Sequence, residues 1–374
     1  DVPFASYDTN DTAAAAAAEL DSLGSYYRGP RDQNGKVTTD LLFRGPFVGE
    51  TAGPYMSQLM FTPTSMGAQT IDQKLQTFSP GQEFMTDTDT FLQVQNGVST
   101  GKTLQFDAVS RYLYNGRGLA AYTHVDVLYQ AYFTGLLVLG TLGVPANPGN
   151  PYLNSTKQNG FSTFGGPDYT AAVGEIAARA LNKVWYQKWL VHLTHRPESG
   201  GGVLHQILSG NSKKIDATLN SNILNSQAPQ MVFSQYGTFL LPQPFPEGSP
   251  THPSYPTGHG TVGGACITLL KFFFDGSYVI PNPMVPSADG TSLEPYTGSD
   301  KLTVNGELNK LARNVTFGHG VFSSIHWRSD SDVSMLLGEA VALSWLQDRA
   351  QTYKEKFTIQ IQRLDGSTAT ISNE

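Results

Sequence analysis

The chain has 374 residues, of which 39% are hydrophobic and 15% are charged, and its formal net charge is -7. This composition fits a folded globule with a polar, mostly uncharged surface, and the acidic balance argues against non-specific nucleic-acid binding. No segment reaches the ~18 uninterrupted apolar residues that span a bilayer, because the longest candidate, 125–142, contains Asp126 and Gln130. The only cysteine, Cys266, excludes an intrachain disulfide and lies in an apolar run, which predicts a core residue rather than a nucleophile.

The N-terminal part of the chain predicts irregular structure. An alanine-rich run at 12–20 predicts one helix, and residues 51–115 are rich in Gly, Thr, Gln and Pro, which is typical of loops and short helices. We expect residues 1–100 to form an arm packed on a helical catalytic core at 101–374, within one continuous domain.

Helical periodicity predicts long helices in the rest of the chain. Two are expected over 119–142 and 169–195, and the second should end at Arg196-Pro197, because proline clashes with the preceding helical turn. A glycine-rich loop at 200–202 should follow. The further helices that we expect span 203–225, 257–274, 302–317 and 323–353.

The last residues have a different pattern. Apolar and polar residues alternate over 357–361, and Asp365-Gly366 follows before 368–371, which predicts a β-hairpin. The predicted fold class is therefore mainly α, with packed helical bundles and a short C-terminal β-hairpin.

The segment Pro253–Gly260 is the most informative motif. It places the Thr257 hydroxyl, the Gly258 amide and the His259 imidazole at the start of a predicted helix. Unpaired amides and the helix dipole favour an oxyanion there, and the glycines leave the backbone bare. We therefore expect His259 to be functional rather than a satisfied core histidine.

Lys188 and Arg196 are a second candidate pair. Eight residues apart on one predicted helix, they are separated by about 80° of rotation, so both can face one cavity. Trp185 lies one turn before Lys188. The alternative is that both cations lie on the surface near a helix C-terminus, where the dipole favours them.

His326 and Asp330 form an i,i+4 pair in which a carboxylate can decide which ring nitrogen is free. An exposed helix pair is the alternative, although the flanking Ile325 and Trp327 favour a buried one. His252, seven residues before His259, is equally compatible with a functional and a structural role.

Two other chemistries have little support. His192 and His195 lack a third zinc ligand at a recognisable spacing. A serine hydrolase is disfavoured because no Gly-x-Ser-x-Gly turn exists and Ser254 lies between prolines and an aromatic residue.

At these residues the chain resembles the vanadium-dependent haloperoxidases, and most of all their algal and cyanobacterial bromoperoxidase branch. That family shares its site with type-2 phosphatidic acid phosphatases and bacterial class A acid phosphatases. Its pattern of Lys-x6/7-Arg-Pro, Pro-Ser-Gly-His and Ser/Gly-Arg-x5-His followed by Asp maps onto this chain in the correct order, except for the serine and the second arginine. The matching residues are Lys188, Arg196-Pro197, Pro256–His259, His326 and Asp330, with Trp185, His252 and the run 245–256 matching the bromoperoxidases in particular.

The resemblance implies an enzyme that oxidises bromide or iodide with hydrogen peroxide to hypohalous acid, which halogenates small organic substrates. It implies vanadate as cofactor, with phosphate able to occupy the same site, and a homo-oligomer. His326 would ligate vanadium, and Asp330 and Trp185 would support the site. The residues implied to bind the oxyanion are Lys188, Arg196, Thr257, Gly258, His259 and His319; the implied catalytic residues are His259, Lys188 and His252. His259 would accept a proton from the peroxide, and Lys188 would polarise it for halide attack.

Two departures from the family pattern bear on the site. Thr257 replaces the family's serine. The second arginine is missing: six residues before His326 stands Gly320, and one residue earlier His319, in a segment one residue longer than usual. A protonated His319 could replace that arginine, but without a bidentate guanidinium.

Two alternatives stay open from the sequence: a phosphomonoesterase on the same scaffold, with His326 as nucleophile, and an impaired oxyanion-binding homologue. The chain begins at Asp1 rather than at methionine, which we interpret as a removed leader. That interpretation predicts a secreted or periplasmic protein, with a cytoplasmic location still open.

Overall fold

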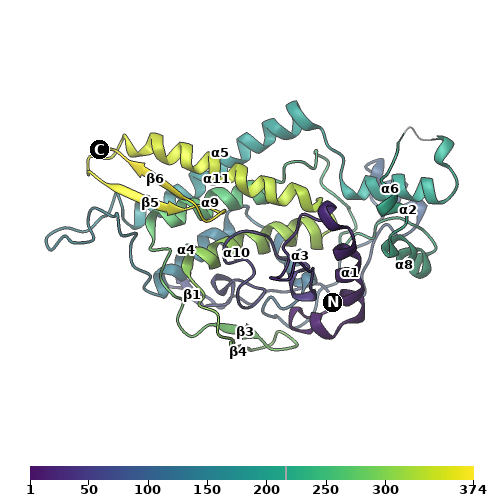
Figure 1. Ribbon diagram of the computed structural model, residues 1–374, viewed down its shortest axis with the longest axis horizontal. Coiled ribbons are helices and arrows are strands. Elements are labelled where there is room, and N and C mark those ends of the chain that lie inside the picture. Colours follow the sequence, from purple (N-terminus) through teal and green to yellow (C-terminus); the bar gives the residue numbers. More distant parts are fainter. Residues whose placement is uncertain (215–216) are drawn as a thin grey trace.

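The computed structural model describes residues 1–214 and 217–374 as a predominantly helical molecule (Figure 1). The α-helices are α1 (Asp11–Ser22), α2 (Thr88–Gln95), α3 (Gly116–His124), α4 (Gln130–Thr141), α5 (Gly166–Tyr186), α6 (Pro197–Leu208), α7 (Ser221–Leu224), α8 (Gln227–Tyr236), α9 (Gly258–Phe273), α10 (Val304–Phe317) and α11 (Arg328–Ala350). Two π-helical turns, η5 (Gln187–His192) and η7 (Gly318–Phe322), follow α5 and α10. The antiparallel strand pairs are β1 (Thr64–Met66) with β2 (Gln69–Ile71), β3 (Met284–Pro286) with β4 (Leu293–Pro295), and β5 (Thr358–Gln362) with β6 (Thr368–Ser372).

Helix α9 is the centre of the core, with α5, α10 and α11 packed around it. Its residues from His259 to Phe273 are all buried. Glycines let α11 approach: a Cβ at Gly264 would lie 2.0 Å from the Met335 carbonyl oxygen, and one at Gly338 would lie 2.0 Å from that of Thr261. This close crossing brings the N-terminus of α9 next to the first turn of α11, and the candidate site lies there.

The mainly helical fold and the C-terminal hairpin are confirmed. Ile359 pairs with Ile371 and Ile361 with Ala369 in β5 and β6, and all three isoleucines are buried. None of the helices in the described part of the chain combines the length and the apolar character that crossing a membrane requires.

The single helix predicted over 119–142 is wrong. The chain leaves α3 at Val125, whose φ of -132° and ψ of 45° are not helical, and re-enters a helix only at Gln130. The break has a consequence for the site, because it turns the buried side chain of Asp126 towards His259.

The prediction that one helix runs to His195 and is followed by a glycine-rich loop is also wrong. Helix α5 ends at Tyr186, and Pro197 starts α6, since proline lacks only an amide that is unpaired anyway at the first helical position. The glycines lie inside α6 for packing reasons: a Cβ at Gly200 would lie 2.8 Å from the Trp327 ring, and one at Gly201 would lie 2.8 Å from Leu241.

The helix predicted over 302–317 is confirmed as α10, but the one predicted over 323–353 starts later. The turn η7 intervenes, Ser324 adopts a left-handed φ of 56°, and α11 begins only at Arg328. His326 therefore precedes the helix, and Asp330 lies in its first turn.

Candidate active site

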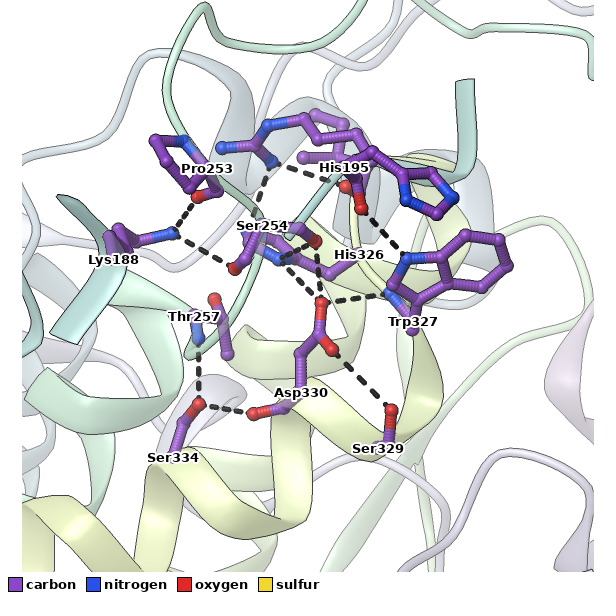
Figure 2. A network of polar contacts seen from close by, with 12 residues as sticks. Lys188, His195, Pro253, Ser254, Thr257, His326, Trp327, Ser329, Asp330 and Ser334 are labelled. Atoms are coloured by element: carbon purple, nitrogen blue, oxygen red, sulfur yellow. Dashed lines mark hydrogen bonds and ion pairs between the residues drawn. The ribbon is translucent and has the colours of Figure 1, made fainter. Parts of the chain in front are cut away.

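Three segments that are distant in the sequence meet at the N-terminus of α9. They are η5 with the start of α6, the stretch 252–259 that leads into α9, and the stretch 319–330 that joins η7 to α11 (Figure 2). The structure brings the predicted site residues together in this place.

His326 is buried and has a defined tautomer. Its Nδ1 lies 3.1 Å from the Ser254 hydroxyl and 3.2 Å from Asp330 Oδ2, while its Nε2 lies 3.3 Å from Arg196 Nη1. Because a guanidinium can only donate, Nε2 must accept, so the ring proton is on Nδ1. Burial, followed by Arg196, lowers the pKa of His326 well below its ordinary value, which keeps the ring neutral. The Nε2 lone pair is thus directed at the cationic side of the site.

Ser254 connects the histidine to the lysine. Its hydroxyl donates to Asp330 Oδ2 over 2.6 Å, and its carbonyl oxygen accepts from Lys188 Nζ over 2.9 Å. Burial raises the pKa of Asp330, and the hydrogen bond from Ser254 opposes that rise. Figure 2 shows the serine between the ammonium and the carboxylate.

Lys188 is fully buried on η5, with its ammonium directed at the carbonyl oxygens of Pro253 (2.6 Å) and Ser254. Burial, with a smaller effect of Arg196, lowers its pKa to about 7. A Leu193 N–H bond to the Lys188 carbonyl, five residues back, closes the π-turn. The argument that Lys188 and Arg196 share one helix face is therefore wrong, although both side chains do reach one site.

Arg196 is the N-cap residue of α6 and joins the three segments. Its Nε donates to the His252 carbonyl (2.9 Å), its Nη1 to the Ile325 carbonyl (3.2 Å), and its Nη2 lies 3.1 Å from His252 Nδ1. Burial lowers the pKa of Arg196 to about 10, so the cation persists at neutral pH. Burial and both cations lower the pKa of His252 to about 4, and its neutral ring stands 4.8 Å from that of Trp185.

The α9 N-terminus supplies hydrogen-bond donors. Thr257 is the N-cap residue, and its amide donates to Ser334 Oγ over 2.7 Å. Within the described residues its buried hydroxyl has no partner, and no side chain caps the first turn. A Cβ at Gly258 would meet only Leu181 Cδ1, at 3.9 Å. The first turn of α9 therefore presents a free hydroxyl and a bare backbone.

His259 is held by a carboxylate. Its Nε2 lies 2.9 Å from Asp126 Oδ1, and because a carboxylate accepts, this nitrogen carries the proton and Nδ1 is left as the acceptor. Its ring stacks on that of His319, with centroids 3.7 Å apart. The arrangement suits a group that receives a proton at Nδ1.

His319 lies in η7, one residue before Gly320, the position at which the family pattern has its second arginine. Its ring centroid is 5.5 Å from that of His326, so it belongs to the site. Burial, then His259 and Arg196, lowers its pKa well below the ordinary value, so the ring is neutral in this structure rather than a permanent cation. Gly320 is no open position, since a Cβ there would lie 3.3 Å from that of His326. A π-turn holds one residue more than an α-turn, which accommodates the longer segment.

The residues fit a tetrahedral oxyanion. Among residues 1–214 and 217–374, neither Lys188 nor Arg196 has a carboxylate oxygen within 4 Å. Two buried cations without a paired anion are costly unless an anion joins them. The free Thr257 hydroxyl and the bare Gly258 supply neutral donors for the same ligand.

A surface groove adjoins the site. A cavity of about 370 Å³ is lined by Arg196 and His252 together with Trp189, Leu193 and Glu198, among others. Small solutes could approach the two basic side chains from this side.

Ser254, Asp126 and Ser334 were missed as site residues. Ser254 was weighed only as a nucleophile, whereas its role here is to hold other side chains. The one signal for Asp126 was a carboxylate in the otherwise apolar run 125–142. Ser334, which supports Thr257 and bonds to the Asp330 carbonyl, carried no signal that spacing could reveal.

Several known proteins are similar to this chain, although no family model matches it. The vanadium-dependent bromoperoxidase of Ascophyllum nodosum is 36% identical over 384 residues, which covers 98% of this chain and 68% of that protein. Those of Corallina officinalis and Corallina pilulifera are 33% and 34% identical over 386 residues, covering 91% of this chain and 64% of each of theirs. The homohexameric structure of the second vanadate-dependent bromoperoxidase of Ascophyllum nodosum matches with a TM-score of 0.91 at 30% identity, covering 99% of this chain and 68% of that one.

Proposed function

The chain belongs to the vanadium-dependent bromoperoxidase family, and we propose that it acts as a vanadate-dependent haloperoxidase that oxidises bromide or iodide with hydrogen peroxide. In the balanced reaction the halide loses two electrons and the O–O bond of the peroxide breaks. One oxygen leaves as water, and the other joins the halide as hypohalous acid, with one proton consumed. The hypohalous acid then halogenates small organic substrates.

Each residue of the site can be assigned a role in this reaction. Bound vanadate would supply a Lewis-acid centre for the peroxide, and the oxidation state of vanadium would not change. His326 would hold it through Nε2, because Ser254 and Asp330 keep the proton on Nδ1. Lys188, Arg196, His319, the Thr257 hydroxyl and the Gly258 amide would bind its oxygens.

The acid/base role falls to His259. Asp126 holds its Nε2–H, so Nδ1 can accept a proton from the peroxide. Lys188 would polarise the peroxide by its charge. His252 would stay neutral at the edge of the groove, where it positions Arg196.

One observation carries this proposal: the neutral, buried His326 directs a lone pair at Arg196, and neither Arg196 nor the buried Lys188 of the same site has a carboxylate partner within 4 Å among the described residues. The test is to incubate the protein with vanadate, remove the excess, and measure bound vanadium and the bromination of monochlorodimedone. One vanadium per chain with peroxide- and bromide-dependent bromination is expected. Stoichiometric vanadium without bromination would instead favour an impaired homologue.

The phosphomonoesterase alternative is not favoured by the relatives, which are bromoperoxidases. Phosphomonoesterase activity can be measured as the hydrolysis of p-nitrophenyl phosphate by the vanadate-free protein. We further propose that the chain forms a homo-oligomer, since a structural relative is a homohexamer.

Vanadate affinity is expected to fall as pH rises above about 7. Burial places the pKa of Lys188 there in the free protein, so at higher pH the lysine must take up a proton when the anion binds. This linkage weakens binding by up to about tenfold per pH unit, whereas Arg196 stays charged. Titrations at several pH values compare the parent with Lys188→Gln, and the anion's own protonation is common to both. Equal slopes of log Kd against pH in the two proteins would contradict the assignment.

His319→Arg is expected to tighten vanadate binding by about one to two decades, because a charged hydrogen bond contributes about 1.5–3 kcal/mol. His319→Ala should bind as the parent does at pH 8, where the parent's His319 is neutral, and more weakly at pH 5.5, where the bound anion favours imidazolium. The measurement is vanadate affinity at both pH values. Identical affinities in all three proteins would mean that His319 does not face the oxyanion.

Ser254→Ala is expected to weaken vanadate binding by about 10–100-fold, the usual effect of removing a group that orients a metal ligand. The hydroxyl contacts both His326 Nδ1 and Asp330 Oδ2, so its loss leaves only the 3.2 Å contact between Nδ1 and Asp330 to orient the ring. Ser329→Ala is the matched control, since Ser329 contacts Asp330 at 3.4 Å and forms no bond to His326 among the described residues. A Ser254→Ala variant with the parent's affinity would rule out this positioning role.

A further inference from the structure

Two tryptophans from α5 and η5 stand at the groove beside the site. Trp189 lines the groove together with Arg196 and His252, and it is 42% exposed. Trp185 is 44% exposed, and its ring centroid lies 4.8 Å from that of His252 and 6.3 Å from that of Trp189. Figure 1 shows this end of α5 at the edge of the molecule, before the chain turns back to α6. The two indoles therefore form an open wall next to residues of the site.

The groove offers a way out for the product of the proposed reaction. Arg196 connects it to the site, because its Nη1 lies 3.3 Å from His326 Nε2 while its Nη2 lies 3.1 Å from His252 Nδ1. Arg196 and His252 also line the groove. A hypohalous acid that forms at an oxyanion beside Arg196 and leaves on this side therefore passes Trp189.

Trp189 is the side chain on this route that halogen modifies most durably. Among the described residues that line the groove it is the only indole, and none carries a thioether, a thiol or a phenol. The imidazoles of His195 and His252 also line the groove. A halogen on an imidazole nitrogen is passed on to the next acceptor, whereas a halogen on an indole carbon stays. The groove thus holds one permanent acceptor for the electrophile.

We propose that Trp189 is a self-modification site, at which the hypohalous acid that the enzyme makes halogenates the protein when no organic substrate is present. The inference rests on the proposed function, because the oxidant is its product. The Cγ–Cδ1 double bond of the indole supplies an electron pair to bromine, the O–Br bond of hypobromous acid breaks, and the hydroxide takes up the displaced ring proton as water. Water then displaces bromide and a proton to leave an oxindole, so the ring has lost two electrons to bromine.

The sequence makes the two tryptophans separable by mass spectrometry. Lys188 lies between them, so trypsin releases Trp185 in peptide 184–188 and Trp189 in peptide 189–213, because trypsin does not cut the Arg-Pro bond inside the second peptide. The second peptide contains no methionine, tyrosine or cysteine. A paired bromine isotope pattern, or one added oxygen, on this peptide is therefore assigned by fragmentation to Trp189 or to one of its histidines.

The test compares oxidant made in the site with oxidant added from outside. The vanadate-loaded full chain turns over peroxide and bromide without an organic acceptor, and vanadate-free protein receives the same amount of hypobromous acid as reagent. The reference is Met231, which is 49% exposed on α8 and does not line the groove. The ratio of modified Trp189 to modified Met231 should be about tenfold higher during turnover, because oxidant made beside Trp189 has a high effective concentration there. A sample with peroxide but no bromide corrects for direct oxidation of the thioether.

Trp189→Phe keeps an aromatic ring in the groove wall and removes the indole. It should brominate monochlorodimedone at the parent's rate and lose most of the modification of peptide 189–213. Trp185→Phe is the matched control and should keep that modification, counted per turnover.

Equal ratios of Trp189 to Met231 in the two treatments, or an unchanged modification of peptide 189–213 in Trp189→Phe, would overturn the proposal. A protein that brominates monochlorodimedone without the preference for Trp189 refutes the modification site alone. A protein that does not brominate monochlorodimedone at all refutes the proposed function, and the modification site with it.

Discussion

His326→Ala is expected to reduce vanadate affinity by at least 100-fold. Altering a group that merely supports a metal ligand costs about 10–100-fold, and His326 is the proposed ligand itself. Its Nε2 is the one imidazole nitrogen of this ring that Ser254 and Asp330 leave free, so alanine removes the only atom of the residue able to reach the metal. Equilibrium dialysis of vanadate against the vanadate-free protein gives the affinity, independently of turnover.

His192→Ala serves as the control for His326→Ala. His192 lies in η5 near the site, and it is exposed with its ring against Tyr255 rather than among the proposed ligands. The His192→Ala variant should bind vanadate with the parent's affinity. If His326→Ala binds one vanadate per chain with the parent's affinity, the assignment of the metal ligand to His326 is wrong.

The residues that form the site could be predicted because they lie in short motifs whose order and spacing are visible in the sequence. Thr257, Gly258 and His259 are consecutive, and the start of a helix dictates their common direction. His326 and Asp330 remained paired although the helix begins two residues after the histidine. A contact between i and i+4 survives such a shift because the carboxylate in the first turn reaches back over the N-cap.

The local backbone around the cations was harder to predict. A π-turn has no distinct hydrophobic period over six residues, so the sequence of η5 predicted a continuation of the helix α5. Proline was interpreted as a helix end, whereas at Pro197 it begins α6. Both errors concern the path of the chain between Lys188 and Arg196. The two cations nevertheless meet, because hydrogen bonds to the stretch 252–254 hold each of them.

The supporting residues could not be predicted, because their contacts join segments far apart in the sequence. Asp126 lies 133 positions from His259, and Ser254 lies 72 positions from His326. Only packing reveals such pairs. The state of His319 also depends on packing: as an exposed residue it could be a cation, but burial against His259 makes it neutral.

His259→Ala is expected to keep vanadate binding and to lose most haloperoxidase turnover, by about 10²–10⁴-fold, which is the usual contribution of a positioned acid/base. With Nε2 held by Asp126, Nδ1 is the nitrogen that can accept the proton of the peroxide. His259→Gln is the companion variant, because its amide can still bond to Asp126 but cannot take up a proton. Both variants should lose turnover to a similar extent if proton transfer is the role.

The ring of His319 complicates this test, because it lies 3.7 Å from that of His259 and could accept the proton in its place. The double variant His259→Gln/His319→Ala resolves the point. If it is slower than His259→Gln at equal vanadate occupancy, His319 supplies the residual proton transfer. If His259→Gln alone turns over as the parent does from pH 5 to 8, neither proton transfer nor its alignment by Asp126 limits the reaction. The catalytic effect of the site would then arise from the cations, which hold the oxyanion and polarise the peroxide without a base.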